Sequence, residues 1–274
     1  MGKNGFSIVE ILVVIGIIAV LMSLGLAVGR RARETARATQ CMANQRQLLV
    51  ALVAYDSDCG TLPFGNLLYS PMTEVDREDR AGTGIDSLSQ WWFQFILERK
   101  HSRWCEPVLE CPSKSQPDLI VGDRNVLCSN YGVNRSLCRT LDDSPFYEPF
   151  LGRPASLTRL RQPGETLLLC DSGYSLVSWW HALAQPLELT PPTNYYAYRE
   201  ARSYIPGLLA NSSRTDIREF FPVMLDDAIR GRHANKTVNV TFCDGHVART
   251  PAEDLRVDMD GDEYINRSPL WVPR

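Results

Sequence analysis

The chain has 274 residues, with 32 acidic and 29 basic side chains and a net charge of −3, and this near balance argues against a strongly basic nucleic-acid-binding surface. Its aromatic content (six Trp, ten Tyr, nine Phe) is high enough for a packed core, which excludes a disordered body. One local basic cluster directly follows a long apolar segment, where lipid headgroups are its expected partners: Arg30, Arg31, Arg33 and Arg37. We therefore expect one membrane anchor, one globular domain and no nucleic-acid partner.

The segment from Phe6 to Val28 is apolar and carries a single charge, Glu10. About 23 residues of helix extend roughly 34 Å, enough to cross a hydrocarbon core of about 30 Å. A charge at the centre of a span costs about 2.5–3.5 kcal/mol on insertion scales, and less near its end. Glu10 therefore requires a compensating partner.

Three interpretations compete for this segment. A conventional secretory signal would be cut near Ala27-Val28-Gly29, but its apolar core is normally only about 7–15 residues long. A plain membrane anchor explains the length and leaves Glu10 unexplained. The third interpretation rests on the motif that surrounds Glu10.

The sequence "KNGFSIVE" resembles the class III (prepilin) signal of type IV pilins and type II secretion pseudopilins. That signal is a short basic leader ending in Gly, followed by Phe and, at the fifth position after the cut, Glu. Here these residues are Lys3, Gly5, Phe6 and Glu10. The resemblance implies cleavage by a prepilin peptidase after Gly5 and methylation of the new Phe6 amine. It also implies that Glu10 pairs with the amine of a neighbouring subunit, an ion pair that specifies register more than it stabilises.

The resemblance also implies a single-pass inner-membrane protein with its C-terminal head outside the cytoplasm. The arginines after the span favour the opposite orientation, with Lys3 as a weak counterweight. Eight cysteines, an even number, favour an exported body. Four of these cysteines cluster and are expected to form disulfides: Cys105, Cys111, Cys128 and Cys138. Four cysteines allow three pairings, and the sequence does not choose among them. The sequence contains no Cys-x2-Cys pair, so the cysteine spacing does not resemble that of a zinc site.

The apolar segment continues into a second helical half, because no breaker other than Gly29 follows Val28. An apolar stripe on this half is expected to pack on the head: Ala32, Ala36, Ala43, Leu48, Leu49, Leu52 and Val53. The predicted organisation is a leader (1–5), a transmembrane half-helix (6–29), an amphipathic half-helix (30–58), a head (59–250) and an acidic C-terminal tail (251–274).

Within the head, "SQWWFQFILERK" predicts a helix over Ser87–Lys100. Strands are expected at 129–134 and 166–170, and residues 178–225 are expected to form an insertion of loops and helical pieces. "KTVNVTFCDGHVART" predicts a hairpin with Asp244-Gly245 as a two-residue turn.

Two of these segments together, "RQPGETLLLCDSG" and "RHANKTVNVTFCDGHV", resemble the processing-associated domain of prepilin-like proteins common in planctomycetes. That family is named for a His followed nine residues later by Asp-Gly, whereas ten residues separate His233 from Asp244 and Gly245 here. A one-residue insertion before the strand explains the difference. The resemblance implies a pilin-like α+β fold, with an antiparallel sheet laid on the C-terminal half of the long helix.

Two metal hypotheses arise from the sequence. His233, Asp244 and His246 allow a metal or hydrolytic site, although a turn and its flanking strand explain the same residues. Asp258, Asp260 and Asp262 alternate as in calcium loops, but Glu263 replaces the turn Gly and Pro269 the closing acid. Calcium is thus a candidate cofactor, with a solvated acidic tail as the alternative. No hydrolase or phosphate-binding motif is present, so no enzyme is expected, and Cys170 is expected to be inert.

The resulting hypothesis is a structural pseudopilin-like subunit of a type II secretion or type IV pilus-like filament. Its expected partners are the prepilin peptidase, other pilin or pseudopilin subunits through the N-terminal helix, and the membrane. The rival is a membrane-anchored extracytoplasmic binding module that does not polymerise. The sequence indicates neither the cargo nor the particular filament system.

Overall fold

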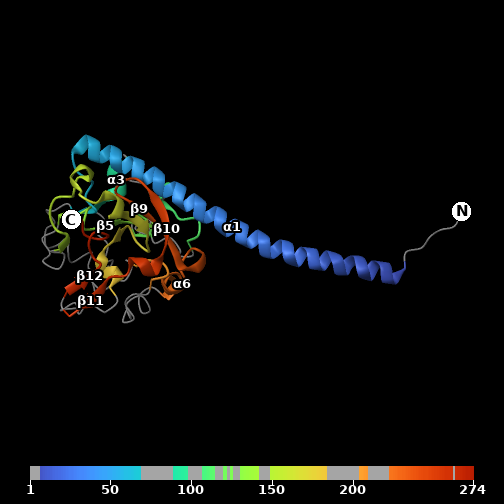
Figure 1. The fold of residues 1–274 in the computed structure, drawn as a ribbon. Helices are drawn as coiled ribbons and strands as arrows, with labels where there is room; N and C mark the ends of the chain where they lie inside the picture. Colours follow the sequence, from blue (N-terminus) through green and yellow to red (C-terminus); the bar gives the residue numbers. More distant parts are fainter. Residues whose placement is uncertain are drawn as a thin grey trace.

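One long helix carries a mixed α+β head at its C-terminal end in the computed structural model of the chain (Figure 1). The structure describes residues 7–68, 89–97, 107–114, 120–121, 124–125, 130–141, 149–183, 204–208, 222–261 and 263–274. The fold class is the expected one, a long N-terminal helix and a five-stranded sheet, and it is consistent with a pilin-like protein.

The long helix α1 spans Ile8–Cys59, 52 residues or about 78 Å. A capping box starts it, since Ser7 Oγ accepts from the backbone N–H of Val9 and the Glu10 carboxylate accepts from that of Ser7. Gly60 ends it at φ 76°, a left-handed conformation that glycine adopts without steric cost. The prediction that the two helical halves form one rod is confirmed.

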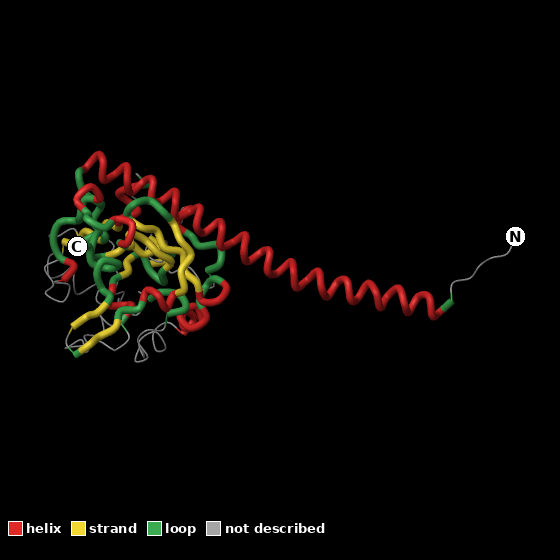
Figure 2. The backbone as a smooth tube through the Cα atoms, in the orientation of Figure 1, coloured by secondary structure: helices red, strands yellow, loops and turns green. Residues whose placement is uncertain are grey.

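Only the C-terminal half of α1 lies against the head, and its N-terminal half projects away from it (Figures 1 and 2). Leu48, Leu49 and Leu52 are buried as predicted. The prediction was wrong for Ala32 and Ala36, which are exposed, because the head begins to cover the helix only near residue 34. It was also wrong for Val53, which is 41% exposed.

A five-stranded sheet faces this half of α1 in the order β10-β9-β7-β5-β8. The strands are β5 (Tyr131–Asn134), β7 (Leu167–Asp171), β8 (Leu176–Val177), β9 (Thr237–Phe242) and β10 (Val247–Pro251). The predicted strands at 129–134 and 166–170 are confirmed as β5 and the central β7. The sheet departs from the expected antiparallel arrangement at one edge, where β8 runs parallel to β5.

Two apolar cores pack on the two faces of this sheet. One lies between the sheet and α1 and includes Leu52, Tyr131 and Leu169. The other contains Val238 and Val240 of β9 together with Trp271 near the C-terminus. Both faces of β7 are therefore covered, which explains why its sequence is a continuous apolar run rather than an alternating one.

The C-terminal segment belongs to the second core. It contains η7 (Ala252–Leu255) and a hairpin of β11 (Asp258–Asp260) and β12 (Glu263–Ile265). Trp271 is fully buried, and its indole N–H donates to the carbonyl of Leu255 at 2.9 Å. The segment expected as an acidic tail after residue 250 is instead packed on the head, because its apolar side chains complete the core beside the sheet.

The predicted helix at Ser87–Lys100 is confirmed in part within the described residues 89–97. It begins as a strand, β2 (Ser89–Trp91), and only α3 (Trp92–Ile96) is helical. β2 pairs with β1 (Asn66–Leu68), which pairs in turn with β6 (Thr140–Leu141). Trp92, the first residue of α3, is fully buried and donates through its indole to the carbonyl of Ser175 at 2.8 Å. Pairing of Ser89–Trp91 with β1 overrides the helical periodicity in the preceding residues.

The predicted hairpin is confirmed as β9 and β10, but its loop has three residues, Cys243 to Gly245, rather than two. The Phe242 N–H donates to the carbonyl of His246, and the Gly245 N–H donates to that of Phe242. Gly245 has φ 106°, as a bulge-forming hairpin residue requires. The remaining described elements are η1 (Pro107–Leu109), β3 (Ile120–Val121), β4 (Arg124–Asn125), η3 (Leu157–Arg159), η4 (Pro163–Glu165), η5 (Trp179–Ala182), α6 (Pro222–Arg230) and η6 (Ala234–Lys236).

Candidate functional site

The N-terminal half of α1 is the first candidate functional region. Its large apolar side chains are uncovered, from Ile8 at 77% exposure to Val28 at 68%. By length and composition this helix is able to cross a membrane. Glu10 lies in its first turn, whereas Gly5 and Phe6 lie outside the described residues. The predicted processing junction therefore stays a prediction.

The second candidate is a polar layer inside the otherwise apolar contact between α1 and the sheet. Gln45 of α1 is fully buried and donates to Asp171 at 3.0 Å and to the backbone carbonyl of Asn239 at 3.1 Å. Its own amide oxygen accepts from the Thr241 hydroxyl at 2.8 Å. These bonds join the helix to the central strand β7 and its neighbour β9, and they fix the position of the Asp171 carboxylate.

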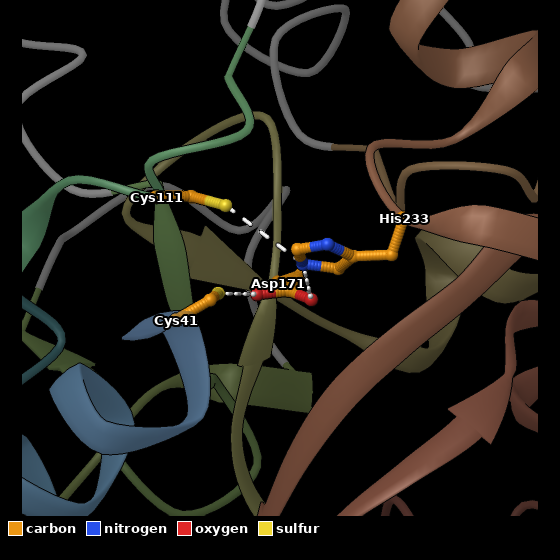
Figure 3. Close-up of side chains that lie close together, drawn as sticks. All are labelled: Cys41, Cys111, Asp171 and His233. Atoms are coloured by element: carbon orange, nitrogen blue, oxygen red, sulfur yellow. Dashed lines mark hydrogen bonds and ion pairs between the residues drawn. The ribbon is translucent and has the colours of Figure 1, made fainter. Parts of the chain in front are cut away.

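Next to this layer, four side chains from distant parts of the chain converge (Figure 3). They are Cys41 of α1, Cys111 just after η1, Asp171 at the end of β7, and His233 immediately before η6. All four are buried, and one ligand-type atom from each lies within 4.8 Å of the other three.

Direct contacts connect the members of this Cys–Cys–Asp–His cluster. The Cys41 thiol donates to Asp171 Oδ1 at 3.1 Å, and His233 Nε2 lies 3.3 Å from Asp171 Oδ2. His233 Nε2 also lies 3.8 Å from Cys111 Sγ. Asp171 Oδ2 additionally accepts from the backbone N–H of Asn239 at 2.7 Å. The carboxylate is therefore bonded on both oxygens.

The cluster shifts the pKa values of its own members. A hydrogen bond from Cys41 is the largest influence on Cys111 and, with that from His233, lowers the pKa of Cys111 to about 6 despite its burial. Burial, the largest cause, raises the pKa of Cys41 well above its usual value. Burial opposes the charged form of His233, but Asp171 and Cys111 outweigh it and raise the pKa of His233 to about 10.

A buried cation and a partly exposed acid flank the cluster. Arg232, whose side chain is fully buried, pairs with Asp227 at 2.9 Å and donates to the backbone carbonyls of Asn130 and Ser172. On the other side, Glu34 Oε1 of α1 lies 3.6 Å from His233 Nδ1. Among the described residues, His233 Nδ1 has no hydrogen-bond partner.

The geometry does not favour hydrolytic chemistry at this cluster. A nucleophile–base–acid triad uses the two ring nitrogens of His for different partners. Here Cys111 and Asp171 both lie against the same atom, His233 Nε2. Cys111 is 1% exposed and His233 3% exposed, so a substrate has no contact surface on the described side chains. The chemistry that remains is metal coordination or a purely structural network.

The structure separates the residues that the sequence had grouped around the Asp-Gly turn. Asp244 accepts from the backbone N–H of His246 at 3.1 Å and contacts its ring at 2.6 Å, so it forms the turn as the structural interpretation predicted. Both side chains are substantially exposed. His233 belongs instead to the buried Cys–Cys–Asp–His cluster.

The calcium hypothesis places Asp258 and Asp260 on β11 of a hairpin, with Asp262 outside the described residues. The Asp258 carboxylate lies 3.5 Å from the Arg256 guanidinium. Calcium binding at these aspartates stays a prediction.

The disulfide prediction was wrong for Cys111 and Cys138, which are free buried thiols, while Cys105 and Cys128 lie outside the described residues. Cys111 lies beside Cys41, a helix residue that the sequence analysis had not connected with it. Cys170 and Cys243 are also free and buried, and burial raises the pKa of both thiols, consistent with an inert role.

A shallow cavity of about 250 Å³ lies on the head away from the cluster. Trp179, Arg139 and Arg267 contribute to its lining, and the Arg267 guanidinium stacks over the Trp179 ring at 4.9 Å. An aromatic face beside two cations can hold a small anion or a sugar.

Comparison with known proteins places part of the chain in context. Residues 30–98 match a family described as protein of unknown function (DUF1559). The match covers about a quarter of the chain, namely the second half of α1 and the start of the head, and reaches neither the Gly5–Phe6 junction nor His233 and Asp244. Neither the curated proteins nor the solved structures contain a match to the chain.

Proposed function

We propose that the chain is a pseudopilin-like subunit, cleaved by a prepilin peptidase between Gly5 and Phe6 and assembled through α1 into a type II secretion or type IV pilus-like filament. The observation that carries the proposal is α1 itself. Its apolar N-terminal half extends beyond the head with its side chains exposed, whereas its C-terminal half packs on the head (Figure 1). The family match at residues 30–98 is compatible with this class and with the rival binding module.

The exposed half of α1 offers a surface for neighbouring helices as well as for lipid. Gly16 and Gly25 lie on it, and a Cβ placed at either position would meet nothing within 4 Å. Small residues in membrane helices allow close backbone approach between helices. In this proposal the inner membrane holds the subunit, with the head outside the cytoplasm, until these faces pack in the filament.

In a single subunit Glu10 caps its own helix. Pairing with the amine of a neighbouring subunit would have to replace this capping bond. Its carboxylate closes the capping box by accepting from the Ser7 N–H at 2.8 Å. After cleavage, the Phe6 amine of a neighbouring subunit becomes a stronger partner, because a buried unpaired charge is far costlier than a paired one. A Gln at this helix position can still close a capping box, but it cannot neutralise an amine. This difference separates the two roles experimentally.

The rival function is a membrane-anchored binding module that does not polymerise. The observation in its favour is the cavity at Trp179, Arg139 and Arg267, whose lining suits a small anion or sugar. This rival assigns Glu10 to helix capping alone. Neither function assigns catalysis to the chain.

The experiment compares full-length wild type, Glu10→Val and Glu10→Gln by crosslinking in membranes. The reporter is Ala36→Cys on the exposed face of α1, in a Cys59→Ser background because Cys59 is itself an exposed thiol. The same background without Ala36→Cys is the control for other thiols. Carbonate extraction measures membrane insertion of every variant.

The assembly proposal predicts crosslinked ladders in wild type and their loss in both Glu10 variants, with insertion unchanged or improved. Val and Gln should behave alike, since both remove the charge. Ladders in Glu10→Gln equal to those in wild type would show that Glu10 only caps its helix. Equal ladders in all three proteins would refute the role of Glu10 in assembly.

A further inference from the structure

Each of the four side chains in the Cys–Cys–Asp–His cluster offers an atom that could coordinate a metal ion. Two thiols, one carboxylate and one imidazole come from four elements and meet in a buried space between α1 and the sheet. Buried polar side chains in a helix–sheet contact are costly, and an apolar contact would stabilise the same docking. Thiolate and imidazole are the donor groups that zinc prefers in closed protein sites.

The separations between the donor atoms fit a four-coordinate ion. With zinc bonds of about 2.0–2.3 Å, the edges of a tetrahedron are about 3.3–3.8 Å long. The contacts between neighbouring donors measure 3.1 Å for Cys41 Sγ to Asp171 Oδ1, 3.3 Å for Asp171 Oδ2 to His233 Nε2, and 3.8 Å for His233 Nε2 to Cys111 Sγ. Cys41 contacts Oδ1 of Asp171 and His233 contacts Oδ2, and the ligand-type atoms of all four residues lie within 4.8 Å of one another. Shifts of up to about 1 Å would place one donor atom from each residue around a common centre.

The surroundings also resemble the outer shell of a metal site. A metal-bound His commonly directs its second ring nitrogen to a carboxylate, and His233 Nδ1 faces Glu34 Oε1 at 3.6 Å. Ligating carboxylates are normally held by further hydrogen bonds, and Gln45 and the Asn239 N–H hold Asp171. The Asn239 amide nitrogen, 3.1 Å from His233 Nε2, would have to give up that contact.

We propose that Cys41, Cys111, Asp171 and His233 bind one Zn²⁺ ion that joins α1 to the head. Binding forms two Zn–S bonds, one Zn–N bond and one Zn–O bond. The protons of the Cys41 thiol and of His233 Nε2 leave to solvent, together with that of Cys111 where it is protonated. The ligand charges of two thiolates and one carboxylate exceed that of the ion by one.

The site is structural, because four protein ligands leave no position for water or substrate. Its consequence is a link between residues 41 and 233 that holds the long helix on the sheet. Metal loading then depends on the docking of α1, since Cys41 is the one ligand on that helix. The calcium hypothesis at Asp258 and Asp260 concerns a different part of the head and a different, oxygen-only donor set.

The test measures metal in full-length protein purified in detergent under reducing conditions. Elemental analysis is expected to find one zinc per chain in wild type and at least tenfold less in Cys111→Ala. The matched control is Cys138→Ala, which removes another buried free thiol outside the cluster and should keep its zinc. Glu34→Gln should weaken zinc affinity by about tenfold, as expected for an outer-shell carboxylate.

A second measurement on the wild type keeps the test decisive if Cys111→Ala fails to fold. Cobalt added to the chelator-treated, reduced protein should give the visible bands of tetrahedral Co²⁺ and ultraviolet thiolate-to-cobalt charge transfer. The proposal is overturned if the wild type contains no zinc and gives no such bands, or if Cys111→Ala and Cys138→Ala retain equal zinc. A Cys41–Cys111 disulfide, seen by mass spectrometry of the protein purified without reductant, would overturn it as well.

Discussion

Replacing the buried Arg232 with Met should destabilise the head more than an Arg→Met substitution at a surface salt bridge does. The guanidinium is fully buried and binds the Asp227 carboxylate at 2.9 Å, which itself is only 1% exposed. It also donates to the carbonyl of Asn130 at 3.0 Å and to that of Ser172 at 2.7 Å. Met fills a similar volume but donates to none of these groups.

The magnitude follows from what is left unpaired. After the change, the Tyr204 hydroxyl at 2.7 Å is the side-chain donor that Asp227 keeps among the described residues. The Ser172 carbonyl loses the guanidinium, whereas the Asn130 carbonyl still accepts from the Ser172 N–H. Removing one partner of a buried ion pair typically costs about 3–5 kcal/mol. For a domain of this size, that corresponds to a fall in Tm of about 10 °C.

The assay is urea unfolding of the full-length protein in detergent, followed by tryptophan fluorescence. Arg230→Met is the matched control, because its salt bridge with Asp226 is on the surface, at 78% and 63% side-chain exposure, and should contribute less than about 1 kcal/mol. The double variant Asp227→Leu, Arg232→Met should lose less stability than the sum of the two single variants. The reasoning is refuted if Arg232→Met lies within about 1 kcal/mol of wild type.

Three further outcomes are expected from the same full-length protein. Gly173→Ala should cost about 1–3 kcal/mol of unfolding free energy, because the added Cβ would overlap the Tyr204 ring; an unchanged urea midpoint would contradict this close packing. Millimolar calcium should raise the Tm of wild type and not that of Asp260→Ala, whereas no shift in wild type would leave the aspartates without an ion. Burial opposes ionisation of Asp244, but hydrogen bonds from His246 outweigh it and lower the pKa of Asp244. Its contribution, under about 1 kcal/mol, is present at neutral pH and lost as pH falls through that lowered pKa, so the Tm difference between wild type and Asp244→Asn should close below about pH 4 and not above it.

The sequence predicted those elements whose signal is local. The apolar run and the capping residues Ser7 and Glu10 are contiguous with α1, and the run before Asp171 has the composition of a buried central strand. The helix predicted over Ser87–Lys100 begins later than expected, because periodicity cannot report that Ser89–Trp91 pair with β1. Exposure of Ala36 escaped prediction for a similar reason, since the point where the head begins to cover α1 is set by tertiary packing.

The metal-type cluster was missed because its four members lie on four elements with no shared spacing. A search for Cys-x2-Cys pairs cannot find ligands at positions 41, 111, 171 and 233. The sequence contains one indication of the cluster, because Asp171 directly follows the apolar run of a central strand. A carboxylate buried at such a position requires hydrogen-bond or ionic partners. Its neighbour Cys170, which the sequence indicated as an inert thiol, faces the other core. Only the pairing of β7 with β9 and the docking of α1 bring the partners together.

The central claim is that the chain is processed as a prepilin, and the mass of the mature N-terminus tests it most directly. The measurement is mass spectrometry of the full-length protein isolated from membranes, beside Gly5→Leu, in which the cut should be blocked. The proposal predicts a wild-type chain that begins at an N-methylated Phe6 and a Gly5→Leu chain that keeps residues 1–5. A wild-type chain that still begins at the leader, or one cut near Ala27-Val28-Gly29, would contradict it.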